Sequence, residues 1–206
     1  MGDSVTRSID ALQRLYTIVV GLALTEAVRG FLAAPTPAAG ISQSTPASLG
    51  LLLIMVFTVV PFYHGANNYL DATYIFGQQS SPRRYTLLVD FFSLFAEGVF
   101  MVMMGLSIAN QVRFLSLFQV LLIIDIAWAV FVYFAVTSED ARRSVVRWCI
   151  INLLAVAALF LVRKSPLLAD EDRLTVAVSV AIARTFFDYT FCWDFYLGRR
   201  KAQAVA

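Results

Sequence analysis

The sequence predicts an all-α, polytopic membrane protein with six transmembrane helices and both termini in the cytoplasm. Of its 206 residues, 59% are hydrophobic and the mean hydropathy is +0.73, whereas a soluble domain is about 45–50% apolar. Six apolar stretches each approach the roughly 20 residues that an α-helix needs to cross a bilayer. These stretches consume most of the chain, so we expect one six-helix transmembrane domain over 1–206 with short cytoplasmic tails.

Short connections separate the apolar stretches and mark where they end. The first connection, APTPAAGISQSTPAS, is uncharged and rich in Pro, Ala and Ser. Two later ones, SEDARR and RKSPLLADEDR, are charged and typical of turns. With these boundaries, the six spans fall at 13–33, 49–70, 85–108, 113–136, 146–163 and 174–197.

The first two spans contain residues that a purely hydrophobic helix would lack. Glu26 and Arg29 interrupt the apolar core of the first span, which therefore predicts a retained helix and not a cleaved secretory signal. Pro61 removes a backbone hydrogen-bond donor inside the second span and predicts a kink there.

The remaining spans differ in how many polar residues they carry. Because the fifth span, IINLLAVAALFLV, offers only Asn152, we expect it to pack outside the other five, against lipid or another subunit. The other three spans hold ionisable residues, namely Asp90, Glu97, Asp125, Arg184 and Asp188.

The distribution of basic residues predicts the orientation. Ten lie at one side of the expected membrane and four at the other, which places both termini in the cytoplasm. The ten are Arg7, Arg14, Arg83, Arg84, Arg142, Arg143, Arg147, Arg199, Arg200 and Lys201, and the four are Arg113, Arg163, Lys164 and Arg173.

This topology predicts a multi-pass protein of a cell membrane, of the bacterial inner-membrane type, with lipids as its first partners. The basic end LGRRK suits anionic lipid better than nucleic acid. Tyr189, Trp193 and Tyr196 suit an interfacial aromatic belt. The two cysteines, Cys149 and Cys192, fall near cytoplasmic helix ends, so we expect free thiols.

Several ionisable residues are expected at a similar depth. Glu26, Glu97, Asp125 and Arg184 each lie about 10 to 13 residues into their spans, near the bilayer centre at about 1.5 Å per residue. A charge facing lipid there costs roughly 2.5 to 3.5 kcal/mol. We therefore expect the first, second, third, fourth and sixth helices to surround a polar centre.

Spacing along the helices supports shared polar faces. Arg184 and Asp188 are four residues apart and can touch, while Arg29 lies one turn from Glu26. Away from the span ends, five acids accompany two arginines, which leaves about three carboxylates without a guanidinium. These residues are Glu26, Asp90, Glu97, Asp125 and Asp188 against Arg29 and Arg184. Each surplus carboxylate must be protonated, hydrated or bound to a cation. The alternative is a set of buried ion pairs that only fixes the helix register.

A second polar group follows the apolar run LLLIMVFTVV of the second span, in the stretch PFYHGANNYLD. His64, Asn67, Asn68 and Asp71 recur near helical spacing and form a broad polar face. One interpretation is a cytoplasmic vestibule in which His64 titrates near neutral pH. The other is that the helix emerges among lipid headgroups there and its polar face is solvated.

The sequence excludes several classes of site. A single histidine rules out bis-histidine haem and multi-histidine zinc sites within one chain. No GxSxG, HExxH, CxxC or phosphate-binding glycine loop occurs, so we expect no enzyme activity, no catalytic residues, no metal site and no cofactor.

Two functions are consistent with these features. The first is a small, oligomeric channel or transporter whose carboxylate and arginine network handles protons or cations. The second is a non-transporting sensor, assembly or effector subunit that acts through a protein partner.

Overall fold

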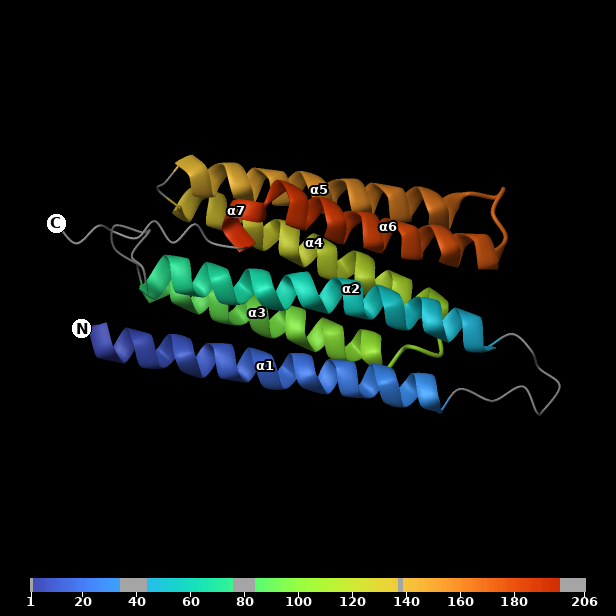
Figure 1. Cartoon of the computed structure of the whole chain (residues 1–206), viewed down its shortest axis with the longest axis horizontal. Coiled ribbons are helices and arrows are strands. Elements are labelled where there is room, and N and C mark those ends of the chain that lie inside the picture. Colours follow the sequence, from blue (N-terminus) through green and yellow to red (C-terminus); the bar gives the residue numbers. More distant parts are fainter. Residues whose placement is uncertain (1, 34–43, 76–83, 137–138, 197–206) are drawn as a thin grey trace.

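The computed structural model describes residues 2–33, 44–75, 84–136 and 139–196, and these form a bundle of long helices (Figure 1). The prediction of an all-α chain is confirmed. The elements are α1 (Gly2–Leu32), α2 (Ser44–Leu70), the π-helix η2 (Asp71–Ile75), α3 (Arg84–Gly105), α4 (Gln111–Ala135), α5 (Glu139–Lys164), α6 (Asp170–Phe191) and the short α7 (Trp193–Tyr196).

Within these ranges, six helices are long and apolar enough to cross a membrane, as many as the sequence predicts. Successive long helices alternate in direction, so the start of α1 and the short α7 lie toward the same end of the bundle (Figure 1). We call this the terminal end and the opposite one the distal end. The membrane-length segments are Val5–Leu32, Ala47–Ile75, Tyr85–Gly105, Gln111–Ala135, Ala141–Lys164 and Asp170–Phe191.

The six helices close into a ring in the order α1, α3, α4, α5, α6, α2. The prediction that the fifth span packs outside the others is therefore wrong, because α5 lies between α4 and α6. One face of α5 carries exposed side chains such as Leu154 and Leu161, while Asn152 on the other face is fully buried. Hydropathy alone could not separate these faces, since a lipid-facing surface and a packed interior are both apolar.

The end of α2 changes its helical geometry near the polar residues that follow Pro61. Pro61 lies inside α2, which continues to Leu70 and then widens into the π-helix η2. Such π-helical turns are rare and often occur at functional sites. Here η2 carries Tyr74, whose hydroxyl reaches Asp90 on α3.

α1 and α3 approach closely because α3 presents glycine to α1. A side-chain carbon added at Gly105 would lie 2.5 Å from the carbonyl oxygen of Ala23 and 3.2 Å from the amide nitrogen of Ala27. Backbone atoms cannot rotate away as a side chain can, so the contact admits only glycine at this position. The same approach sets the relative depth of residues on the two helices.

Gly105→Ala is expected to destabilise the chain by about 1–3 kcal/mol, because the added methyl group pushes α1 away from α3. The matched control is Gly21→Ala, since no atom lies within 4 Å of a carbon added at Gly21. We expect this control to leave the melting temperature unchanged or to raise it, as alanine favours helix over glycine. Thermal unfolding in detergent compares the two variants. Equal melting temperatures would show that the close contact between α1 and α3 does not contribute to stability.

Candidate functional site

Four polar side chains meet in the middle of the bundle, one from each of four neighbouring helices. We call Glu97 of α3, Asp125 of α4, Asn152 of α5 and Arg184 of α6 the central cluster. None of the four is more than 3% exposed. All lie near the midpoints of their helices, so the expectation of charges gathered at one depth holds for this group.

Hydrogen bonds link three members of the central cluster, Arg184, Asn152 and Asp125, in sequence around the ring. Arg184 donates from Nε to Oδ1 of Asn152 at 2.6 Å, and Asn152 donates from Nδ2 to Oδ2 of Asp125. Glu97 lies next to Asp125, close enough for each carboxyl group to feel the charge of the other. Asn152 therefore joins the only buried guanidinium among the described residues to the pair of carboxyls.

Several polar atoms of the cluster have no hydrogen-bond partner in the protein. Buried polar groups in native structures are paired with protein or water in the great majority of cases, because leaving one unpaired costs about 1–3 kcal/mol. Here the unpaired atoms point to water molecules or an exchangeable ligand among these side chains. They are Oε1 of Glu97, Oδ1 of Asp125, and Nη1 and Nη2 of Arg184.

Tyr16 of α1 adds a hydroxyl to the same region. Its side chain is 3% exposed, its hydroxyl has no hydrogen-bond partner, and it lies close enough to Glu97 and Asp125 to feel their charge. On the opposite side, the guanidinium carbon of Arg184 stacks 4.9 Å from the ring centroid of Phe62. The central cluster is thus bounded by one aromatic side chain from α1 and another from α2.

Asp90 occupies a separate and fully paired position nearer the terminal end. It accepts hydrogen bonds from the hydroxyl of Tyr74 at 2.6 Å, from Nε1 of Trp128 at 2.9 Å and from the hydroxyl of Tyr69 at 3.2 Å. Asp90 is fully buried, so three neutral donors take the place of a positively charged partner. We call these four residues the Asp90 cage.

Asp188 forms a third buried acidic position. Its Oδ2 accepts a hydrogen bond of 2.7 Å from the hydroxyl of Tyr196, while its Oδ1 has no partner. The predicted contact with Arg184 is wrong as a salt bridge: the ion pairs of 4 Å or less among the described residues lie elsewhere. Nε of Arg184 is instead directed at Asn152, and Tyr196 takes the other side of Asp188.

Glu26 and Arg29 lie away from the central cluster, contrary to the expectation of a common depth. α1 begins at Gly2 and ends at Leu32, so Glu26 falls in its last third and packs against Gly105, the last residue of α3. Arg29 is 78% exposed in its side chain and pairs with Glu26 at 3.7 Å. This pair lies toward the distal end of the bundle, where a long arginine side chain can reach the headgroups.

The polar face at the end of α2 and the start of η2 divides between two neighbours. His64 contacts Tyr189 through Nδ1 at 3.2 Å, and Asn68 donates to the carbonyl oxygen of Tyr196 at 2.8 Å, so both meet the C-terminal helices. Asp71 accepts from Gln13 of α1 at 2.9 Å. Asn67 donates to the carbonyl of Tyr63 on its own helix. All four are partly buried, and none lines the cavity beside them.

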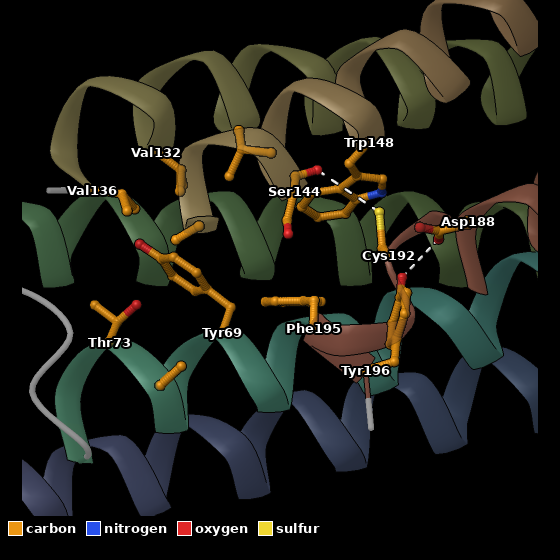
Figure 2. Close-up of a pocket in the computed structure, with 13 residues that line it drawn as sticks. Tyr69, Thr73, Val132, Val136, Ser144, Trp148, Asp188, Cys192, Phe195 and Tyr196 are labelled. Carbon is orange, nitrogen blue, oxygen red and sulfur yellow. Dashed lines mark hydrogen bonds between the residues drawn. The ribbon is translucent and has the colours of Figure 1, made fainter. Parts of the chain in front are cut away.

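That cavity has a volume of about 40 Å³ and lies at the terminal end, between η2, α4, α5 and α7 (Figure 2). Figure 2 shows aromatic side chains and Asp188 around it, with Tyr196 bonded to Asp188. Its polar edge is Asp188, one helical turn from Arg184. The cavity is therefore lined by the buried acid Asp188 and not by the predicted vestibule residues, which lie behind its wall.

The interior between the central cluster and the distal end is apolar. Side chains from three helices, α2, α3 and α4, fill it and are less than 2% exposed. These side chains close the bundle between the central cluster and the distal end, where α4, α5 and α6 line a second pocket of about 70 Å³. The half toward the terminal end holds Asp90, Asp188 and the cavity. The closing side chains are Leu51, Ile54, Met55, Met101, Met104, Phe114, Phe118 and Leu121.

Sequence reasoning identified the buried acids but missed most of their partners. Tyr196 was expected in an interfacial belt and is instead 4% exposed against Asp188, while Trp193 is 58% exposed as a belt residue should be. Asn152 could have been recognised as the one polar residue in an otherwise apolar span. In the part of the chain that the structure describes, no three His, Cys, Asp or Glu side chains gather to hold a metal ion.

Comparison with protein-family models, curated proteins and solved structures finds no match to this chain. The case for a function is therefore made from the geometry of the central cluster.

Proposed function

We propose that this protein is a membrane transporter that binds and releases protons at Glu97 and Asp125. The observation that carries the proposal is the burial of both carboxyls in one cluster, each with an unpaired oxygen, beside a single guanidinium. Two ionised carboxylates repel each other in such a cluster, whereas one shared proton turns the repulsion into a hydrogen bond. The pair is therefore built to hold a proton.

The charge balance of the interior supports proton binding. Among the described residues, the buried charged side chains are Asp90, Glu97, Asp125 and Asp188 against Arg184. Glu26 and Arg29, one acid and one base, both lie outside this group of buried residues. The surplus of three acids expected from the sequence is therefore unchanged. The three donors of the Asp90 cage stabilise one of these acids, and Arg184 offsets a second. The remaining charge requires a proton, water or a cation.

The arrangement along the bundle favours a transporter over an open channel. Polar side chains extend from the terminal end to the central cluster, and apolar side chains close the distal half. An ion at Glu97 and Asp125 could reach the distal side only if helices move. Such alternating exposure of one buried site is the usual mechanism of secondary transporters.

Orientation, membrane and assembly are part of the same proposal. The ten-to-four distribution of basic residues supports a cytoplasmic terminal end, which would make the site open toward the cytoplasm. We propose the bacterial inner membrane and a homo-oligomer. The second function, a non-transporting subunit that acts through a protein partner, would use the same buried charges to fix helix packing.

A pH jump applied to proteoliposomes on a solid-supported membrane tests proton binding directly, because it records charge displacement without a known substrate. We expect a displacement for the wild type and none for Glu97→Gln. Glu26→Gln is the matched control, since Glu26 lies in a membrane-length helix yet outside the central cluster, and it should keep the signal. If the wild type gave no more signal than protein-free liposomes, the non-transporting function would replace the proposal.

A further inference from the structure

We infer that the cavity at the terminal end binds a small primary alkylammonium ion, with Asp188 as its counter-ion and aromatic rings around its alkyl part. That this ion is the transported substrate rests on the proposed function, whereas its binding does not. The inference follows from the unpaired oxygen, the lining and the size of the cavity.

The first support is the state of Asp188. Its side chain is 1% exposed and lines the cavity together with the neighbouring Cys192, and its Oδ1 has no hydrogen-bond partner. Tyr196 holds the other oxygen at 2.7 Å and so fixes the orientation of the carboxyl group. A buried carboxylate oxygen left open in this way recruits a cationic donor, because charge-assisted hydrogen bonds are about twice as strong as neutral ones.

The second support is the lining. Side chains of Tyr69, Trp148, Phe195 and Tyr196 surround the space together with valines from α4 and α5 (Figure 2). Aromatic faces attract an ammonium group when it is desolvated, and they also accept the adjoining methylene groups. An alkali ion requires several oxygen ligands and finds mostly carbon here. An organic ammonium ion matches both the carboxylate and the apolar walls.

The third support is the size. A single water molecule needs about 10–15 Å³ of such volume, so a cavity of about 40 Å³ holds roughly three or four non-hydrogen atoms. Ethylammonium and propylammonium have three and four, whereas tetrabutylammonium is far larger. The cavity therefore selects short, unbranched amines.

The test is equilibrium binding of propylammonium chloride to the full-length protein in detergent, measured by isothermal titration calorimetry at constant ionic strength. We expect saturable binding that n-propanol, the neutral analogue of the same size, does not reproduce. Tetrabutylammonium and sodium should not compete. Absence of saturable binding, an equal response to n-propanol, or competition by either cation would each overturn the inference.

Two variants locate the site. Asp188→Asn should weaken binding by about ten-fold or more, since it removes the charge that the ammonium group meets. Ala72→Leu should block binding by filling the cavity without changing any charge. Asp71→Asn is the control on the neighbouring residue outside the cavity and should bind as the wild type does. Unchanged affinity in both Asp188→Asn and Ala72→Leu would exclude this cavity.

The pH-jump measurement separates this inference from the proposed function, because it is made without any amine. If the wild type gave the charge displacement but did not bind propylammonium, only the inference would be overturned. Propylammonium binding without any displacement would support the cavity as a binding site and leave Glu97 and Asp125 without a transport role.

Discussion

Replacing Arg184 by methionine is expected to destabilise the folded protein by about 3–5 kcal/mol. Methionine has a similar length and packs well against Phe62, so the loss comes from charge and hydrogen bonding and not from volume. Asn152 loses its donor at 2.6 Å, and the nearby carboxyls lose the one buried guanidinium found among the described residues. Thermal unfolding in detergent should show a melting temperature lowered by about 6–20 °C.

A double variant isolates the charge from other effects. Arg184→Met combined with Asp125→Asn removes one positive and one negative group, so we expect it to be more stable than Arg184→Met alone. The control is Arg14→Met, because Arg14 is 76% exposed in its side chain and pairs with Asp10 on the surface. Exposed pairs contribute about 0–1 kcal/mol. A similar loss in Arg14→Met and Arg184→Met would contradict the role assigned to the buried arginine.

The number of membrane-length helices could be predicted from sequence because bilayer thickness fixes the length of an apolar segment. The depth of each charged residue within the bundle was harder to predict than the number of helices, as Glu26 shows. The predicted span began at residue 13, whereas α1 begins at Gly2 with a mixed polar and apolar first half. Counting from the wrong start moved Glu26 from the distal end to the centre of the bilayer.

The facing of α5 could not be predicted for a different reason. In a membrane bundle, residues toward lipid and residues toward the core are both apolar, so the pattern of α5 carried no clear facing signal. Only Asn152 broke the pattern, and its importance depends on Asp125 and Arg184, which approach it from two other helices. A single sequence contains no spacing rule for such contacts between helices.

The Asp90 cage illustrates the same limit. Tyr69, Tyr74 and Trp128 are 21, 16 and 38 residues from Asp90 in the chain. Tyrosine and tryptophan in membrane helices commonly indicate interfacial belts, so nothing local marked these three as donors to one carboxyl. The sequence shows that burying Asp90 in a membrane helix costs free energy. It does not show which hydrogen-bond donors offset that cost.

Asp90→Ala is expected to be nearly as damaging as the loss of Arg184, although it removes a charge that has no basic partner. The substitution leaves the hydroxyls of Tyr69 and Tyr74 and Nε1 of Trp128 without their shared acceptor. Tyr69 and Trp128 are buried, whereas Tyr74 is only partly buried. Each unpaired buried donor costs about 1–3 kcal/mol, so we expect a total loss of about 2–6 kcal/mol by thermal unfolding in detergent.

Trp128→Phe should cost less than Asp90→Ala, because it removes one donor and leaves the carboxyl with two. Asp10→Ala is the control, since Asp10 makes an exposed pair with Arg14, and we expect a change below about 1 kcal/mol. Asp90→Ala could instead prove neutral or stabilising. The free-energy cost of burying the carboxyl would then equal or exceed the stabilisation from its three hydrogen bonds. Asp90 would then be retained at a net cost to stability, as a functional acid would be, and it would join Glu97 and Asp125 as a candidate proton site.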